Sequence, residues 1–65
     1  MPRGVVANFD ALVGLGVVRG DDGLEFPFHC VAIADGTRTI DPGTVVCFET
    51  TPRFGRLEAA RIEPA

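Results

Sequence analysis

The stretch VGLGVV at residues 13–18 leads into the segment LGVVR, residues 15–19, which is rich in the β-branched residues typical of a strand. It is followed by GDDG at residues 20–23, where Asp-Gly favours the positive φ angles that a tight β-hairpin turn requires. The next segment, LEFPFHC at residues 24–30, is again rich in residues that favour strands. The sequence therefore predicts two antiparallel strands, at residues 15–19 and 24–30, joined by a hairpin.

The second predicted strand alternates in a way that separates a buried face from an exposed one. Phe26 and Phe28 fall on one face, whereas Pro27 and His29 fall on the other. We expect the two phenylalanines to lie in the core. Because Pro27 cannot donate a ladder hydrogen bond, we expect it at a sheet edge or a bulge.

Glycine and proline divide the rest of the chain into short segments. Residues 4–9 (GVVANF) and 44–51 (TVVCFETT) are typical of strands, and residues 32–43 are expected to form a loop. Residues 56–62 have types that favour helix, but an isolated helix of this length is marginal in water, so we interpret them as a strand that closes the sheet. Five short strands between turns predict an all-β fold, a small five-stranded antiparallel barrel in which the last strand closes the sheet.

The length allows one domain, residues 1–65, near the lower limit at which a chain builds its own core. No apolar run is long enough to cross a bilayer, and the first residues do not have the pattern of a secretion signal. We therefore expect a cytoplasmic protein without a membrane partner. Cys30 and Cys47 are expected to be free thiols, because small disulfide-stapled folds contain more cysteines.

The charge of the chain bears on its partners. All six basic residues are arginine, and nine acids bring the net charge to −3. Non-specific affinity for nucleic acid comes mainly from neutralised phosphates, so bulk electrostatics do not favour phosphate binding here. A local basic patch stays open as an alternative.

In order and spacing, the segments resemble the bacterial cold-shock domain family, whose members are five-stranded OB-fold barrels that bind single-stranded RNA and DNA. The likeness is carried by GVVANFD at residues 4–10, VGLGVV at residues 13–18 and FPFHC at residues 26–30. It continues downstream at Ala32-Ile33, the loop of residues 36–40, Pro42-Gly43, Val46, Phe48-Glu49 and Ala59-Ala60.

The resemblance implies a site from which most stacking rings are missing. The family's tryptophan position holds Asn8, and the two phenylalanine positions of the first motif hold Leu15 and Val17. Phe9 and His29 are the rings that remain. Pro27, Cys30 and Thr37 stand at further aromatic positions, and Ala7 and Val13 at lysine positions. Since stacking is worth about 1–3 kcal/mol per base, the resemblance predicts a divergent member with weakened or altered binding.

The first functional hypothesis is therefore a single-stranded nucleic-acid-binding protein that acts weakly or on a narrowed set of sequences. Phe54 is included because a ring in a turn between Arg53 and Arg56 has access to a base. RNA and DNA are not distinguished, nor is a base preference. The candidate binding residues are Asn8, Phe9, Leu15, Val17, His29, Arg38, Phe54 and Arg56.

The alternative is a protein-interaction module, or a homodimer, that uses branched side chains in place of rings. If Leu15, Val17, Pro27 and Cys30 lie on the outer sheet face, they form a contiguous aliphatic patch, and such patches tend to mark partner surfaces. A shifted register or a covering loop would remove that patch.

An enzyme is not expected, and no catalytic, metal or cofactor site is predicted. The chain has no serine, and His29 and Cys30, as neighbours on a strand, point to opposite faces. Two cysteines and one histidine do not supply the four ligands of a structural zinc site.

Overall fold

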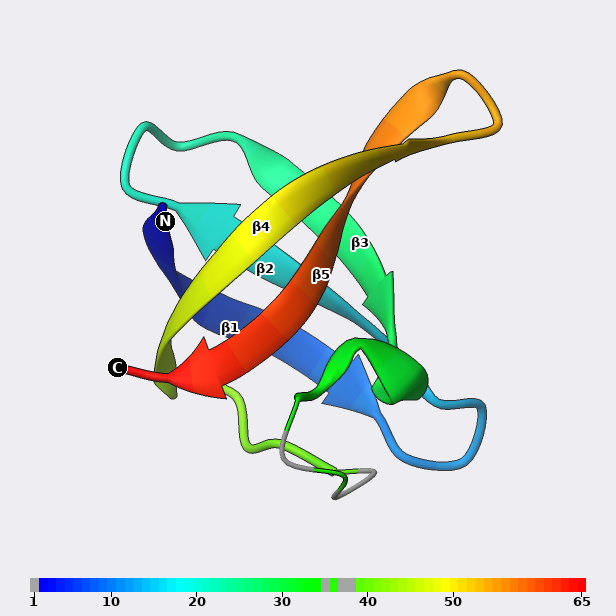
Figure 1. Ribbon diagram of the computed structural model, residues 1–65. Coiled ribbons are helices and arrows are strands. Elements are labelled where there is room, and N and C mark those ends of the chain that lie inside the picture. Colours follow the sequence, from blue (N-terminus) through cyan, green and yellow to red (C-terminus); the bar gives the residue numbers. More distant parts are fainter. Residues whose placement is uncertain (1, 35, 37–38) are drawn as a thin grey trace.

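The computed structural model describes residues 2–34, 36 and 39–65, which form one curled antiparallel sheet (Figure 1). The spatial order of the strands is β3-β2-β1-β4-β5, so β3 and β5 are the two edges. The all-β, five-stranded antiparallel fold is as predicted. The elements are β1 (Arg3–Asp10), β2 (Leu15–Gly20), β3 (Glu25–His29), the 3-10 turn η1 (Cys30–Ala32), β4 (Val45–Arg53) and β5 (Arg56–Pro64).

The ambiguous C-terminal segment is a strand, as the sequence interpretation proposed. Residues of β5 pair with β4 from Arg53↔Arg56 to Val46↔Pro64. The strand is longer than predicted at its C-terminal end. Its helix-favouring residue types are overridden because the sheet supplies hydrogen-bond partners and a core that an isolated helix would lack.

Two irregularities bend the sheet. In β1 the register shifts between Val6 and Asn8, which leaves Ala7 as an extra residue, and in β5 one extra residue lies opposite the step from Cys47 to Glu49. Bulges of this kind increase twist and curl a sheet. The second one places Ala59 and Ile62, three positions apart, both in the core.

The edges β3 and β5 approach each other but are not joined by a ladder within the described residues, so the sheet is not closed. Past the end of β3, one isolated bridge connects Ile33 to Ile62, and the Ala34 N–H donates to the Ile62 carbonyl at 2.9 Å. The result is a compact OB-like barrel with a seam between β3 and β5.

The core is built from the inward residues of every strand. Phe28 and Phe48 are its largest members, with 1% and 0% of their surface exposed, and Phe26 packs against them from the side. The predicted alternation of the second strand is thus confirmed, and Pro27 lies on the edge strand β3, as expected. The buried set is Val6, Val18, Phe28, Ile33, Val46, Phe48, Ala59 and Ile62.

The described residues contain no helix long and apolar enough to cross a membrane. Cys30 and Cys47 are both half-buried free thiols.

Candidate nucleic-acid interface

The outward residues of β1, β2 and β3 form aligned rows, which we call the outer face. Cross-strand pairing places Asn8 beside Val17 and Val17 beside Pro27. The adjacent row consists of Asp10, Leu15 and His29, and the row at the other end consists of Val5, Arg19 and Glu25. Four of the predicted binding residues, Asn8, Leu15, Val17 and His29, therefore lie together.

The bulge at Ala7 decides which residues of β1 reach this face. With unbroken alternation after the buried Val6, Asn8 would point inward and Phe9 outward. The extra residue reverses that parity, so Asn8 lies with Val17 on the outer face and Phe9 lies opposite Gly16 on the inner one.

Phe9, one of the two rings predicted to remain for binding, packs largely into the fold. Its ring stacks on that of Phe28, with centroids 5.8 Å apart and planes 10° apart. Gly16 lies between them in the register, and a Cβ there would come within 2.6 Å of the Phe28 ring. Glycine at position 16 therefore leaves room for the two rings to stack beneath the outer face. One face of the Phe9 ring is already covered by Phe28.

The outer face is mainly aliphatic and only weakly charged. Leu15 is 45% exposed, Val17 and Pro27 are half-buried, and His29 is exposed. The guanidinium of Arg19 donates to Glu25 at 3.2 Å, so its charge is already paired. Asp10 adds a negative charge to the same surface. The face offers contact area for bases but little attraction for phosphates.

Further apolar side chains lie at the end of this face. Leu12 and Val13 in the β1–β2 loop are 97% and 63% exposed, and Val31 in η1 is 78% exposed. The Cys30 N–H donates to the Gly14 carbonyl at 2.8 Å. This hydrogen bond holds η1 next to the β1–β2 loop (Figure 1). The Cys30 side chain faces Gly14, because a Cβ added at Gly14 would lie 3.0 Å from the Cys30 sulfur.

Phe54 and Arg56 lie elsewhere, on the β4–β5 hairpin, which extends beyond the rest of the sheet in Figure 1. Phe54 is 98% exposed. Arg53 and Arg56 are directly opposite each other in the register, and the Arg53 Nε lies 3.6 Å from Glu58 Oε1. Arg56 has no ion pair among residues 2–34, 36 and 39–65. Arg38, the remaining candidate, lies outside the described residues.

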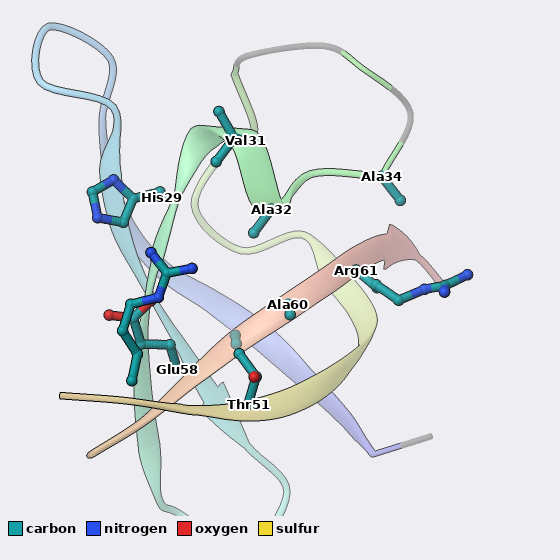
Figure 2. A pocket seen from close by; sticks show the side chains of 10 residues that line it. His29, Val31, Ala32, Ala34, Thr51, Glu58, Ala60 and Arg61 are labelled. Atoms are coloured by element: carbon teal, nitrogen blue, oxygen red, sulfur yellow. The ribbon is translucent and has the colours of Figure 1, made fainter. Parts of the chain in front are cut away.

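A groove of about 320 Å³ runs along the seam between the end of β3 and the β4–β5 pair (Figure 2). His29 and Glu58 lie at one end of it, Arg61 lies at the other, and Ala60 lies on the floor between them. Arg53 also lines this groove. The sequence does not predict this groove, because alanines and threonine at these positions carry no chemical signal before the strands are paired.

Both arginines of the groove are paired with carboxylates. Besides the pair of Arg53 with Glu58, the Nε of Arg61 lies 3.0 Å from Glu49 Oε2. The groove therefore has little free positive charge. Nothing in the described part of the chain brings three or more His, Cys, Asp or Glu side chains together as a metal site.

Comparison with known proteins places this geometry in context. No protein-family model matches the chain. Cold shock protein 2 of Lactiplantibacillus plantarum is 32% identical to it over 65 residues, which cover 98% of each chain.

Proposed function

The chain belongs to the cold-shock protein family, and from that premise we propose that it binds single-stranded RNA or DNA across the outer face of β1, β2 and β3. The observation that carries the proposal is the register, which aligns two outward rows, Asn8–Val17–Pro27 and Asp10–Leu15–His29. They form a continuous surface on which bases can lie flat. OB folds commonly use the face of strands 2 and 3 for oligonucleotides.

Binding on this face is weakened, because bases meet branched aliphatic carbons where relatives of this family present rings. His29 is the exposed ring of the two rows, while Phe9 already stacks on Phe28. Each lost base–aromatic stack removes about 1–3 kcal/mol. Several losses therefore lower the affinity by orders of magnitude, even when they are not additive.

Electrostatics lower the affinity further. Among the described arginines, Arg19, Arg53 and Arg61 are ion-paired, which leaves Arg3 and Arg56 as the cations with no acid partner in that part of the chain. A single strand that gains about two phosphate contacts has a salt slope of roughly −1.4, from about −0.7 per contact. Between 50 and 200 mM salt the affinity should then fall only ~7-fold.

The test is a titration of labelled single-stranded RNA and DNA of about 4 to about 16 nucleotides, the range of OB-fold site sizes. It is carried out at low salt and again at physiological salt. We expect weak, saturable binding with the shallow salt dependence given above. Absence of binding at low salt would overturn the proposal.

Aromatic rings introduced on the outer face test whether the single strand binds there. We expect Leu15→Phe, alone and combined with Val17→Phe, to raise the affinity about 5- to 100-fold per ring that stacks. The matched control is Leu24→Phe, which adds the same ring at a position that is 59% exposed in the turn before β3. Equal gains in control and test variants would show that the outer face is not the site.

A second candidate function is a protein-interaction module or a homodimer that uses the aliphatic face. The observation in its favour is that Leu12, Val13, Leu15 and Val31 are all exposed at one end of the barrel. Sedimentation velocity over a range of concentrations tests self-association, which Leu15→Asp should abolish. A monomer at every concentration contradicts the homodimer.

Both candidates are binding functions, and we infer that the protein acts without catalysis. A cytoplasmic location stays a prediction.

A further inference from the structure

We propose that a second pocket, at the other end of β3 from His29, binds a free apolar amino acid, a small zwitterion with an aliphatic or aromatic side group. The pocket lies between the β2–β3 turn, the start of β1 and the β4–β5 pair. None of its lining residues belongs to the two rows of the outer face, so the site goes beyond the proposed nucleic-acid contact.

The floor of this pocket is apolar and already shaped. The rings of Phe26 and Phe48 have centroids 5.6 Å apart and planes 51° apart, so they form an angled wall and not a flat one. Phe48 is buried and Phe26 is half-buried, whereas Leu57, on β5, is 48% exposed. An apolar group that enters this corner removes from water a surface that folding leaves partly exposed.

Charges of both signs line the same pocket without pairing with one another. Arg3 lies on one side, and Asp21 and Asp22 lie on the other. In the part of the chain that the structure describes, none of these three side chains takes part in an ion pair. A carboxylate is the preferred bidentate partner of a guanidinium, and an ammonium is a partner for aspartate. A ligand that carries one group of each sign therefore supplies a partner to both sides.

Gly20 keeps open the space between the acidic side and the aromatic floor. A Cβ added there would lie 3.0 Å from Asp22 Oδ1 and 3.6 Å from Cε2 of the Phe26 ring. The carboxylate and the ring thus adjoin one small volume. A ligand whose ammonium and apolar group are close together, as they are in an α-amino acid, contacts both at once.

Backbone hydrogen bonds hold the walls of the pocket in place before any ligand binds. The Asp21 N–H donates to the Arg3 carbonyl at 3.1 Å, and the Phe48 N–H donates to the Pro2 carbonyl at 3.0 Å. The start of β1 is therefore fixed to the β2–β3 turn and to β4, and Figure 1 shows it beside that turn. A site of this kind binds without the cost of ordering its own backbone.

Size and charge select the amino acid over other ligands. The volume of about 360 Å³ is near the lower end of the range of about 300–1,000 Å³ for small-molecule sites. Two carboxylates on the rim repel phosphates, which disfavours nucleotides and nucleic acid. The guanidinium of Arg3 disfavours a simple cation. A small molecule with both charges and an apolar group satisfies all these conditions.

The test uses L-phenylalanine as the probe and amide chemical shifts of the ¹⁵N-labelled protein as the readout. We expect saturable shifts at the amides of Arg3, Gly20, Asp21 and Leu57, with a dissociation constant of about 1 mM for a ligand of this size. Two analogues each lack one charge: N-acetyl-L-phenylalanine has no ammonium, and L-phenylalanine amide has no carboxylate. Each should bind about 2- to 5-fold more weakly, the effect of one exposed ion pair.

Charge variants show which group each side chain holds. Arg3→Gln should weaken binding of phenylalanine about 2- to 5-fold but leave binding of its amide unchanged, because the amide has no carboxylate to lose. Asp21→Asn should weaken binding of phenylalanine in the same way and leave the N-acetyl analogue unchanged. A general disturbance of the fold would weaken all three probes equally, and that outcome overturns the assignment.

A matched pair of variants tests the apolar floor. Leu57→Ala should weaken binding about 3- to 10-fold through the lost contact. Val45→Ala is the control, because Val45 on β4 is also 48% exposed but does not line the pocket. Gly20→Ala places a methyl group in the volume beside Asp22 and should also weaken binding. The amide spectrum of each variant shows that it is folded.

The site and the proposed function can fail separately. Shifts that do not saturate within the solubility of phenylalanine overturn the site, and so do equal effects of Leu57→Ala and Val45→Ala. If inorganic phosphate or an oligonucleotide moves these amides and phenylalanine does not, the pocket takes an anion and the proposal is wrong. Failure of the protein to bind any oligonucleotide overturns the proposed function and leaves the amino-acid site standing.

Discussion

The outer face of β1–β3 and the tip of the β4–β5 hairpin differ in how well each satisfies its local requirements. On the outer face the strands alternate regularly around one bulge, and Arg19 is paired with Glu25. At the tip, Phe54 has a left-handed backbone and is exposed, and two arginines are opposed. The residues of the outer face thus satisfy the local preferences of strands and charges, whereas the residues that violate such preferences lie at the hairpin tip.

The clearest contrast is between two phenylalanines. Phe28, beneath the outer face, is 1% exposed, whereas Phe54 is 98% exposed. We expect Phe28→Ala to lower the free energy of unfolding by about 3–5 kcal/mol, which is as much as the core of so small a domain supplies. Circular dichroism should then show an unfolded chain at room temperature. Phe54→Ala should leave the unfolding free energy within about 0.5 kcal/mol of the parent. Equal losses for the two variants would contradict the comparison.

Gly16 tests the layer that supports the outer face. An added Cβ would lie 2.6 Å from the Phe28 ring and 2.7 Å from the Asn8 carbonyl oxygen. We expect Gly16→Ala to cost about 1–3 kcal/mol, because the stacked rings must move. Urea denaturation measures the loss, and Leu15→Ala, at the neighbouring outward position, is the control. A Gly16→Ala protein as stable as the control would show that the rings do not need the space.

Phe54→Asn should change the stability in the opposite direction. Relief of a left-handed phenylalanine should add about 1 kcal/mol to the unfolding free energy, since the conformation costs roughly 1–2 kcal/mol for most L-residues and less for Asn. The midpoint of thermal unfolding should rise by about 4–8 °C. A lower midpoint would mean that the ring stabilises the fold after all.

The smallest expected effect concerns the opposed arginines. Arg56→Glu replaces a repulsive cross-strand pair by an attractive one, which should add about 0.2–0.5 kcal/mol at this exposed position. Thermal melts at low salt and at about 1 M salt measure it, because screening should remove the gain. Arg56→Gln is the control, and a gain of the same size there would assign the effect to the side chain's size and not to its charge.

Much of the fold could be predicted from the sequence because turns and alternation are local. The hairpin at residues 20–23, the inward Phe26 and Phe28 and the edge position of Pro27 all follow from residue types at fixed spacing. The strand at residues 56–62, which extends to Pro64 in the structure, was predicted by counting segments, against its helix-favouring composition. What these successes share is that no distant pairing had to be known.

The candidate site was predictable only in part, because side-chain direction depends on register. One extra residue at Ala7 decides that Asn8 faces outward and that Phe9 does not. The ion pairs of Arg53 and Arg61 depend on how β4 pairs with β5, and the conformation of Phe54 depends on a turn of only two residues. No pattern in the sequence fixes these before the sheet is assembled.

The position of Pro27 on the edge strand has a consequence for solubility. Nine large apolar side chains are exposed among the residues that the structure describes, and exposed apolar surface favours aggregation. Growth of fibrils, however, requires an edge with a full row of backbone donors, and β3 is only five residues long, contains a proline and faces β5 across the seam. The β3 edge is therefore a poor template for pairing with another copy of the chain, even though exposed apolar side chains lie beside it on the outer face.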